Sequence, residues 1–173
     1  SHLEPVAMRL EVKEGVRGCT LINDSYNSDF NSLDIALDFM CRRPDHNGRR
    51  RTLILSDIYQ SGEAQGLLYS KVSQLALNRG VQKFIGVGKA LKDNSSEIRI
   101  PECYFFDDVA SFTASEVFRD LHDELILVKG SRTFGFDYIA ELLEQKVHET
   151  ILEVNLNALV DNYNYYRSLM KPE

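Results

Sequence analysis

The sequence has little of several residue types that mark particular classes of protein. Tryptophan is absent from its 173 residues, which include only 4 prolines, 3 cysteines and 4 histidines. No apolar run approaches the roughly 20 residues that span a bilayer. The start of the chain also lacks a basic segment followed by an apolar one. We therefore expect no membrane partner and no secretory signal.

The few cysteines and histidines argue against a metal site and against a disulfide framework. Cys19, Cys41 and Cys103 are odd in number and do not have the spacing of metal ligands. The histidines are scattered, without clustered acidic or cysteine partners. We expect reduced thiols in a cytoplasmic protein, and no metal site.

Positive charge is also in short supply. The chain has 20 basic and 26 acidic residues, a net charge of -6, whereas general nucleic-acid binding needs a basic surface. One basic run, at 49–51, follows Asp45, Asn47 and Gly48. We interpret it as a solvated turn before a strand, so no nucleic-acid partner is expected.

Apolar periodicity predicts an alternation of strands and helices. Strands are expected at 8–12, 19–24, 51–57, 83–88, 103–106 and 124–130, and helices at 32–43, 64–79, 109–121 and 138–147. Ser32 is placed to cap the first helix and Pro44 to end it. The alternation predicts an α/β fold, a Rossmann-like open, mostly parallel sheet with helices on both faces.

Polar clusters follow three of the expected strands. They are "NDSYN" at 23–27, "SDIYQSG" at 56–62 and "KGSR" at 129–132. Ligands of open α/β sheets bind beyond the carboxyl ends of the strands. Three clusters at one edge therefore indicate a ligand site, although loop residues are polar for ordinary reasons as well.

Each cluster also has a purely structural interpretation. Asp24 could accept hydrogen bonds from a ribose, but spacing alone favours a turn carboxylate that bonds its own backbone. The "KGSR" cations could bind a carboxylate or phosphate, or could simply be solvated. No P-loop sequence is present, and "GVGKA" at 86–90 is interpreted as a strand end with a turn. Asp107 and Asp108 are assigned to a helix start, where acidic residues are favoured.

Taken together and in order, the motifs resemble a known family. "MRLEV", "INDSYNSDFNSLDIAL", "LILSDIYQSGE", "GVG" and "LILVKGSRTFGFDYIAELL" look like the C-terminal domain of the Mur ligases, over residues 3–147. That family joins an amino acid or dipeptide to a UDP-sugar peptide, using ATP and magnesium, through an acyl phosphate. The resemblance implies that the P-loop and the magnesium ligands belong to a central domain absent from this chain.

The resemblance also implies roles for individual residues. Its nearest members take ATP, UDP-N-acetylmuramoyl-tripeptide and D-alanyl-D-alanine, which become the implied partners of the complete protein. Arg9 is the implied catalytic residue, in contact with the terminal phosphate. The implied nucleotide contacts are Asp24, which would bind the ribose, and Tyr26 and Asn27. The implied dipeptide contacts are Lys129, Ser131 and Arg132.

Two loops depart from the family pattern. "YNSDF" has Asp29 and Phe30 where the family has asparagine and proline, and "SDIYQSG" has Ser56 and Gln60 where it has glycine and glutamate. Asp57 keeps the acid of the second motif. These departures concern the shapes of the two loops more than the fold.

The end of the chain, 148–173, is expected to be a separate unit. "TILEVNLNALVDNYNYYRSLMKP" resembles the opening strand and helix of an alanine racemase, a family whose PLP-bearing lysine would lie beyond this chain. No cofactor is expected to bind tightly to the chain alone, and the apolar stripe of this tail could support self-association. The alternative is a stand-alone Rossmann-like module that binds a nucleotide or a partner without catalysis.

Overall fold

The computed structural model describes residues 10–45, 47–59 and 64–145. The predictions for Arg9, for Gln60 and for the racemase-like tail at 148–173 lie outside these residues. Within the described ranges, no helix is long and apolar enough to cross a membrane.

A six-stranded sheet forms the centre of the molecule, in the order β1-β2-β6-β3-β4-β5. The edge strand β1 is antiparallel to β2, and every other pairing is parallel. The strands are β1 (Glu11–Glu14), β2 (Thr20–Asp24), β3 (Arg50–Ser56), β4 (Lys83–Val87), β5 (Glu102–Phe106) and β6 (Glu124–Lys129). The predicted strands are confirmed to within a few residues at their ends.

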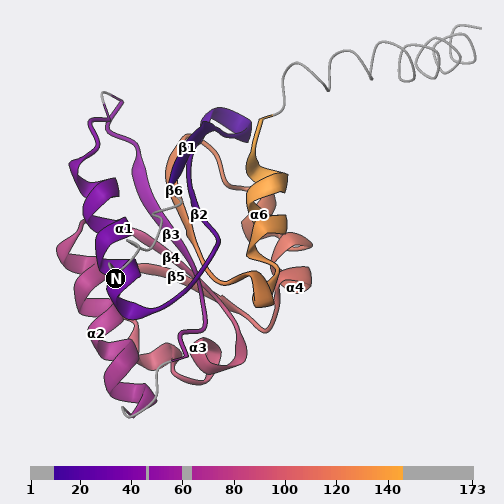
Figure 1. Ribbon diagram of the computed structural model, residues 1–173. Coiled ribbons are helices and arrows are strands. Elements are labelled where there is room, and N and C mark those ends of the chain that lie inside the picture. Colours follow the sequence, from indigo (N-terminus) through magenta and orange to yellow (C-terminus); the bar gives the residue numbers. More distant parts are fainter. Residues whose placement is uncertain (1–9, 46, 60–63, 146–173) are drawn as a thin grey trace, which may run out of the picture.

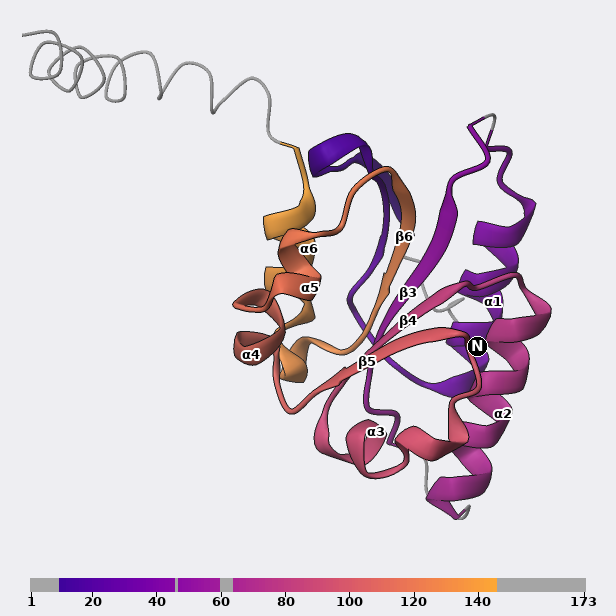
Figure 2. The same cartoon turned by 180° about the vertical axis from the view of Figure 1, so that it is seen from behind.

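Helices cover the two faces of the sheet (Figures 1 and 2). On one face lie α1 (Phe30–Arg42) and α2 (Gln65–Asn78); on the other lie α4 (Val109–Thr113), α5 (Glu116–Arg119) and α6 (Phe136–Leu143). Shorter elements are α3 (Lys89–Asp93) and the 3-10 turns η1 (Val16–Gly18), η2 (Ser95–Glu97) and η3 (Arg132–Phe134). The predicted α/β, mostly parallel architecture with helices on both faces is confirmed.

The central strands supply the core on both sides because successive side chains point to opposite faces. In β3, Leu53 and Leu55 pack into the cluster under α1 and α2, whereas Ile54 packs into the cluster under α6. All three are fully buried. Strands covered on both faces are uninterrupted apolar runs, which explains why the sequence revealed β3 and β6 so clearly.

Three local predictions are wrong. The first helix begins at Phe30, two residues before Ser32, because the side chain of Asp29 accepts a hydrogen bond from the Ser32 N–H at 2.8 Å and caps the helix. The expected helix at 109–121 is divided into α4 and α5, since Ser115 caps a second start by accepting from the Phe118 N–H at 3.2 Å. The segment 86–90 is not merely a strand end and turn, because α3 starts at Lys89.

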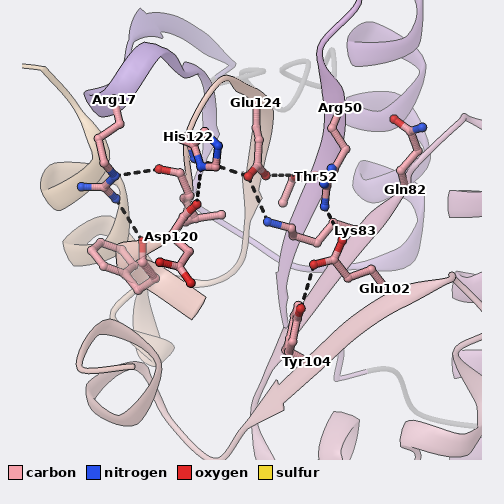
Figure 3. A network of polar contacts seen from close by, with 12 residues as sticks. Arg17, Arg50, Thr52, Gln82, Lys83, Glu102, Tyr104, Asp120, His122 and Glu124 are labelled. Carbon is pink, nitrogen blue, oxygen red and sulfur yellow. Dashed lines mark hydrogen bonds and ion pairs between the residues drawn. The ribbon is translucent and has the colours of Figure 1, made fainter. Parts of the chain in front are cut away.

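Buried charges tie the amino ends of the strands together, at the edge opposite the polar clusters (Figure 3). Lys83 and Glu124 form an ion pair of 2.9 Å with side chains only 7% and 5% exposed, and Thr52 also bonds Glu124. Arg49 is not solvated as expected, because it pairs with Asp45 at 3.0 Å. This edge is therefore structural, and Lys83 and Arg49 are already partnered.

Candidate functional site

The three polar clusters do lie at one edge of the sheet. They follow β2, β6 and β3, which are adjacent in the sheet (Figure 1). The loops also touch: the Ser131 N–H donates to Ser56 Oγ at 3.3 Å, and Ser28 Oγ donates to the Asp57 carbonyl at 3.0 Å. The parallel order of these strands thus brings together segments that are far apart in the sequence.

Asp24 and Lys129 form a buried ion pair at the centre of this edge. They are paired residues in the register of β2 and β6, and Lys129 Nζ lies 3.1 Å from Asp24 Oδ2. Their side chains are 0% and 8% exposed, for Lys129 and Asp24 respectively. Only a small part of the Asp24 side chain is therefore exposed at the surface, and no part of the Lys129 side chain is exposed.

Lys129 also holds Asn27. Its ammonium donates to the Asn27 carbonyl at 2.5 Å and to Asn27 Oδ1 at 2.9 Å. The Asp24 carboxylate and the two Asn27 oxygens together provide one acceptor for each of the three N–H donors of the ammonium. Lys129 is thus fully engaged with the "NDSYN" loop, which does not agree with the implied contact to the dipeptide.

Burial opposes the charge of both members of the pair. Desolvation raises the pKa of Asp24, and the adjacent Lys129 ammonium acts in the opposite direction. Desolvation lowers the pKa of Lys129, and the Asp24 carboxylate counteracts that shift. Each charge is retained through the other, so removal of one partner would leave an unpaired buried charge.

Asp57 faces the protein interior rather than a ligand. Its carboxylate accepts hydrogen bonds from the N–H groups of Ala90 and Leu91 at 3.0 and 2.8 Å, at the start of α3. Gly88 allows this approach, because a Cβ at its position (φ +140°) would lie 2.3 Å from the carboxyl carbon of Asp57. Burial is the main influence on Asp57 and raises its pKa. The acid of the second motif thus has a structural partner.

Tyr26 and Arg132 border an open hollow of about 470 Å³. The Arg132 guanidinium carbon lies 5.8 Å from the centre of the Tyr26 ring, a cation–π distance. Within the described residues Arg132 makes no ion pair, and its side chain is exposed. The hollow is completed by Leu10, Glu11, Asn23, Ser25 and Asp137.

Several contacts at this edge could not be predicted from the sequence. Asn23 Oδ1 is buried without a hydrogen-bond partner in the described chain, and Asn23 lines the hollow. Glu11 reaches the hollow only because β1 folds back and pairs it with Asn23. The ring of Tyr59, which is 72% exposed, stacks on that of Phe134 with 5.8 Å between the ring centres. This contact joins the loop after β3 to η3. Pairing and stacking of this kind depend on the tertiary structure.

The groups at this edge are hydrogen-bonding and charged. Ser131 contributes its N–H to Ser56, and its hydroxyl lies 2.6 Å from Thr133 Oγ1. Among the described residues, no group of His, Cys, Asp or Glu side chains could hold a metal ion. The three cysteines are free thiols, as expected. The fold and this edge together define a Rossmann-like α/β domain with a cluster of polar side chains at the carboxyl ends of its strands.

Comparison with known proteins makes the class more specific. The chain is 25% identical over 146 residues to UDP-N-acetylmuramoyl-tripeptide–D-alanyl-D-alanine ligase of Escherichia coli K12, a match over 84% of the chain and 31% of that ligase. No family profile matches the sequence. The sequence similarity supports the C-terminal domain of a Mur ligase.

Solved structures agree on the fold. Two crystal structures of MurF from Acinetobacter baumannii match with TM-scores of 0.58 and 0.60 at 17% identity, over 80% of the chain and 30% and 31% of those proteins. The D-alanyl-D-alanyl ligase structure from the same species has a TM-score of 0.57 at 19% identity, over 80% of the chain and 29% of that protein. The chain thus spans about a third of the length of the proteins it matches.

Proposed function

We propose that residues 1–147 are the C-terminal domain of an ATP-dependent ligase that adds D-alanyl-D-alanine to UDP-N-acetylmuramoyl-tripeptide in peptidoglycan synthesis. The observation that carries the proposal is the sequence match to a ligase of that name over 84% of the chain. The complete protein would act in the cytoplasm, and its ATP and magnesium chemistry would depend mainly on domains outside this chain.

The proposal gives the polar edge two recognition tasks. Asp24 and Asn27 would face the nucleotide, with the Tyr26 ring beside them, and Arg132 and Ser131 would face the carboxylate of the dipeptide. The hollow next to Tyr26 and Arg132 supports a binding role for this edge, because it combines a ring face, a cation and the unpartnered amide oxygen of Asn23. Arg9, which precedes the described residues, keeps its proposed role at the terminal phosphate.

We further propose that residues 148–173 begin an alanine racemase domain, whose PLP would be held outside this chain. The support is the resemblance of "TILEVNLNALVDNYNYYRSLMKP" to the start of such enzymes. A racemase would supply the D-alanine from which the dipeptide of the ligase is made. The fusion would therefore join two linked steps, because the D-alanine that the racemase makes is a precursor of the dipeptide that the ligase uses.

The coding sequence around this segment provides the first test. A P-loop of the GKT/S type in about 200 preceding residues would support the ligase, and a PLP lysine in the following segment would support the racemase. The 173-residue chain alone, mixed with ATP, magnesium, the UDP-tripeptide and D-alanyl-D-alanine, should release no phosphate above background. Turnover by the isolated chain would contradict the proposal, and absence of any P-loop upstream would favour the stand-alone binding module.

A further inference from the structure

Lys129 lies in the "KGSR" turn but all of its contacts are with the other loop. Its side chain is 0% exposed, and its ammonium is bonded to Asp24 and twice to Asn27. A ligand cannot reach a side chain that water cannot reach. The role of Lys129 must therefore pass through the residues that it holds.

The contacts of Lys129 decide which way the Asn27 amide points. Asn27 Oδ1 accepts from Lys129 Nζ at 2.9 Å and from Ser32 Oγ at 2.9 Å. The ammonium fixes the orientation of the amide, because it can only donate and the NH₂ group of Asn27 could not accept from it. The amide NH₂ is then left as the donor that Asn27 offers to a ligand.

The same ammonium keeps Asp24 an acceptor. Burial favours the protonated carboxyl group, and the cation at 3.1 Å favours the carboxylate. The loop thereby presents one donor, from Asn27, next to one acceptor, from Asp24. That pair is complementary to a nucleoside, whose ribose hydroxyls donate and whose base or phosphate accepts.

We propose that Lys129 is a positioning residue for the nucleotide: it orients Asn27 and holds the Asp24 side chain in place, and it does not contact the dipeptide. This inference rests on the proposed ligase function and assigns Lys129 to the other substrate. It also couples the two loops, since Lys129 leads directly into Gly130, Ser131 and Arg132, the segment placed next to the dipeptide.

The test is Lys129→Met in the complete ligase, with Lys83→Met as the matched control. Both lysines are buried and ion-paired, but Lys83 is bonded to Glu124 at the opposite edge of the sheet. We expect Lys129→Met to raise the KM for ATP about tenfold or more and to change the KM for D-alanyl-D-alanine by less than about threefold. Lys83→Met should leave both KM values within about threefold, whatever it does to thermal stability.

A double variant keeps the test decisive if Lys129→Met does not fold. Asp24→Asn with Lys129→Met removes both charges and so leaves no unpaired buried ion. Because Lys129 acts through both Asp24 and Asn27, the double variant should have an ATP KM at least as high as that of Asp24→Asn alone, and a dipeptide KM within about threefold of wild type. A rise in the dipeptide KM with unchanged ATP KM, in either variant, would overturn the inference. Absence of turnover by the wild-type complete protein would instead contradict the proposed function itself.

Discussion

At the scale of single residues, the account depends on which polar groups are exposed to a ligand and which are not. Asp57, Lys129 and most of Asp24 are buried and bonded within the domain. Tyr26 and Arg132 are exposed and border the hollow. Lys129 and Arg132, both cations of the "KGSR" turn, thus differ in exposure, and substitutions should separate their roles.

Asp24→Ala in the complete ligase tests the nucleotide side of the site. The change removes an acceptor for a ribose hydroxyl and leaves the buried Lys129 cation without its partner, so the KM for ATP should rise. A charge-assisted hydrogen bond of about 1.5–3 kcal/mol corresponds to about a tenfold to hundredfold effect. Steady-state kinetics with ATP varied at saturating dipeptide measure it. Unchanged ATP kinetics would leave Asp24 with a structural role only, as the partner of Lys129.

Arg132→Lys tests the dipeptide side. A guanidinium can pair with a carboxylate at two points, and an ammonium cannot copy that geometry even though the charge is kept. We expect weaker use of D-alanyl-D-alanine, by a loss of about 1–2 kcal/mol in kcat/KM, with ATP kinetics preserved. An effect confined to ATP would instead place this turn on the nucleotide side.

At the scale of elements, the strands could be predicted and the connections between them could not. Buried apolar runs such as 51–57 carry their own signal, because both faces of the strand must be apolar. Helix starts were less certain: Ser32 and Asp29 are both good capping residues, and only the path of the loop decides between them. The engagement of Lys129 with Asn27 joins residues 102 positions apart and has no local signal.

Tyr69 links α2 to the loop after β3 and gives a pH-dependent test of that packing. It is fully buried, and its hydroxyl oxygen accepts from the Ile58 N–H at 3.0 Å. Burial raises the pKa of Tyr69 to about 12. An unfolded tyrosine ionises near pH 10, so the folded state holds the proton more tightly. The stability that this provides is complete below about pH 10 and is lost as the pH rises through about 12.

Tyr69→Phe should therefore destabilise the 173-residue chain by about 1–3 kcal/mol at neutral pH, because the Ile58 N–H loses its partner. The deficit relative to wild type should shrink between about pH 10 and 12, where the unfolded tyrosine has lost its proton and the folded one still holds it. Urea unfolding over a pH series measures both values, with the half-exposed Tyr138→Phe as control. A deficit that stays constant up to about pH 12 would show that the pKa of Tyr69 is the same in the folded and unfolded states.

At the scale of the whole molecule, the domain has a sheet with a hydrophobic core on each face, but only some of the residues that the proposed ligase reaction needs. It spans about a third of the matched ligases, and its described residues contain no group that could hold a metal ion. Much of the recognition edge was predictable, because parallel strands must end together. The assignment of substrates came from the order of motifs, which is information about the family and not about this chain's geometry.

The most direct test of the central claim is product analysis by mass spectrometry with the complete protein. ATP, magnesium, UDP-N-acetylmuramoyl-tripeptide and D-alanyl-D-alanine should yield the UDP-linked pentapeptide with one phosphate released for each amide bond formed. Omission of the dipeptide or deletion of residues 1–147 should abolish the product. Nucleotide binding without any pentapeptide under these conditions would contradict the account and identify the domain as a binding module.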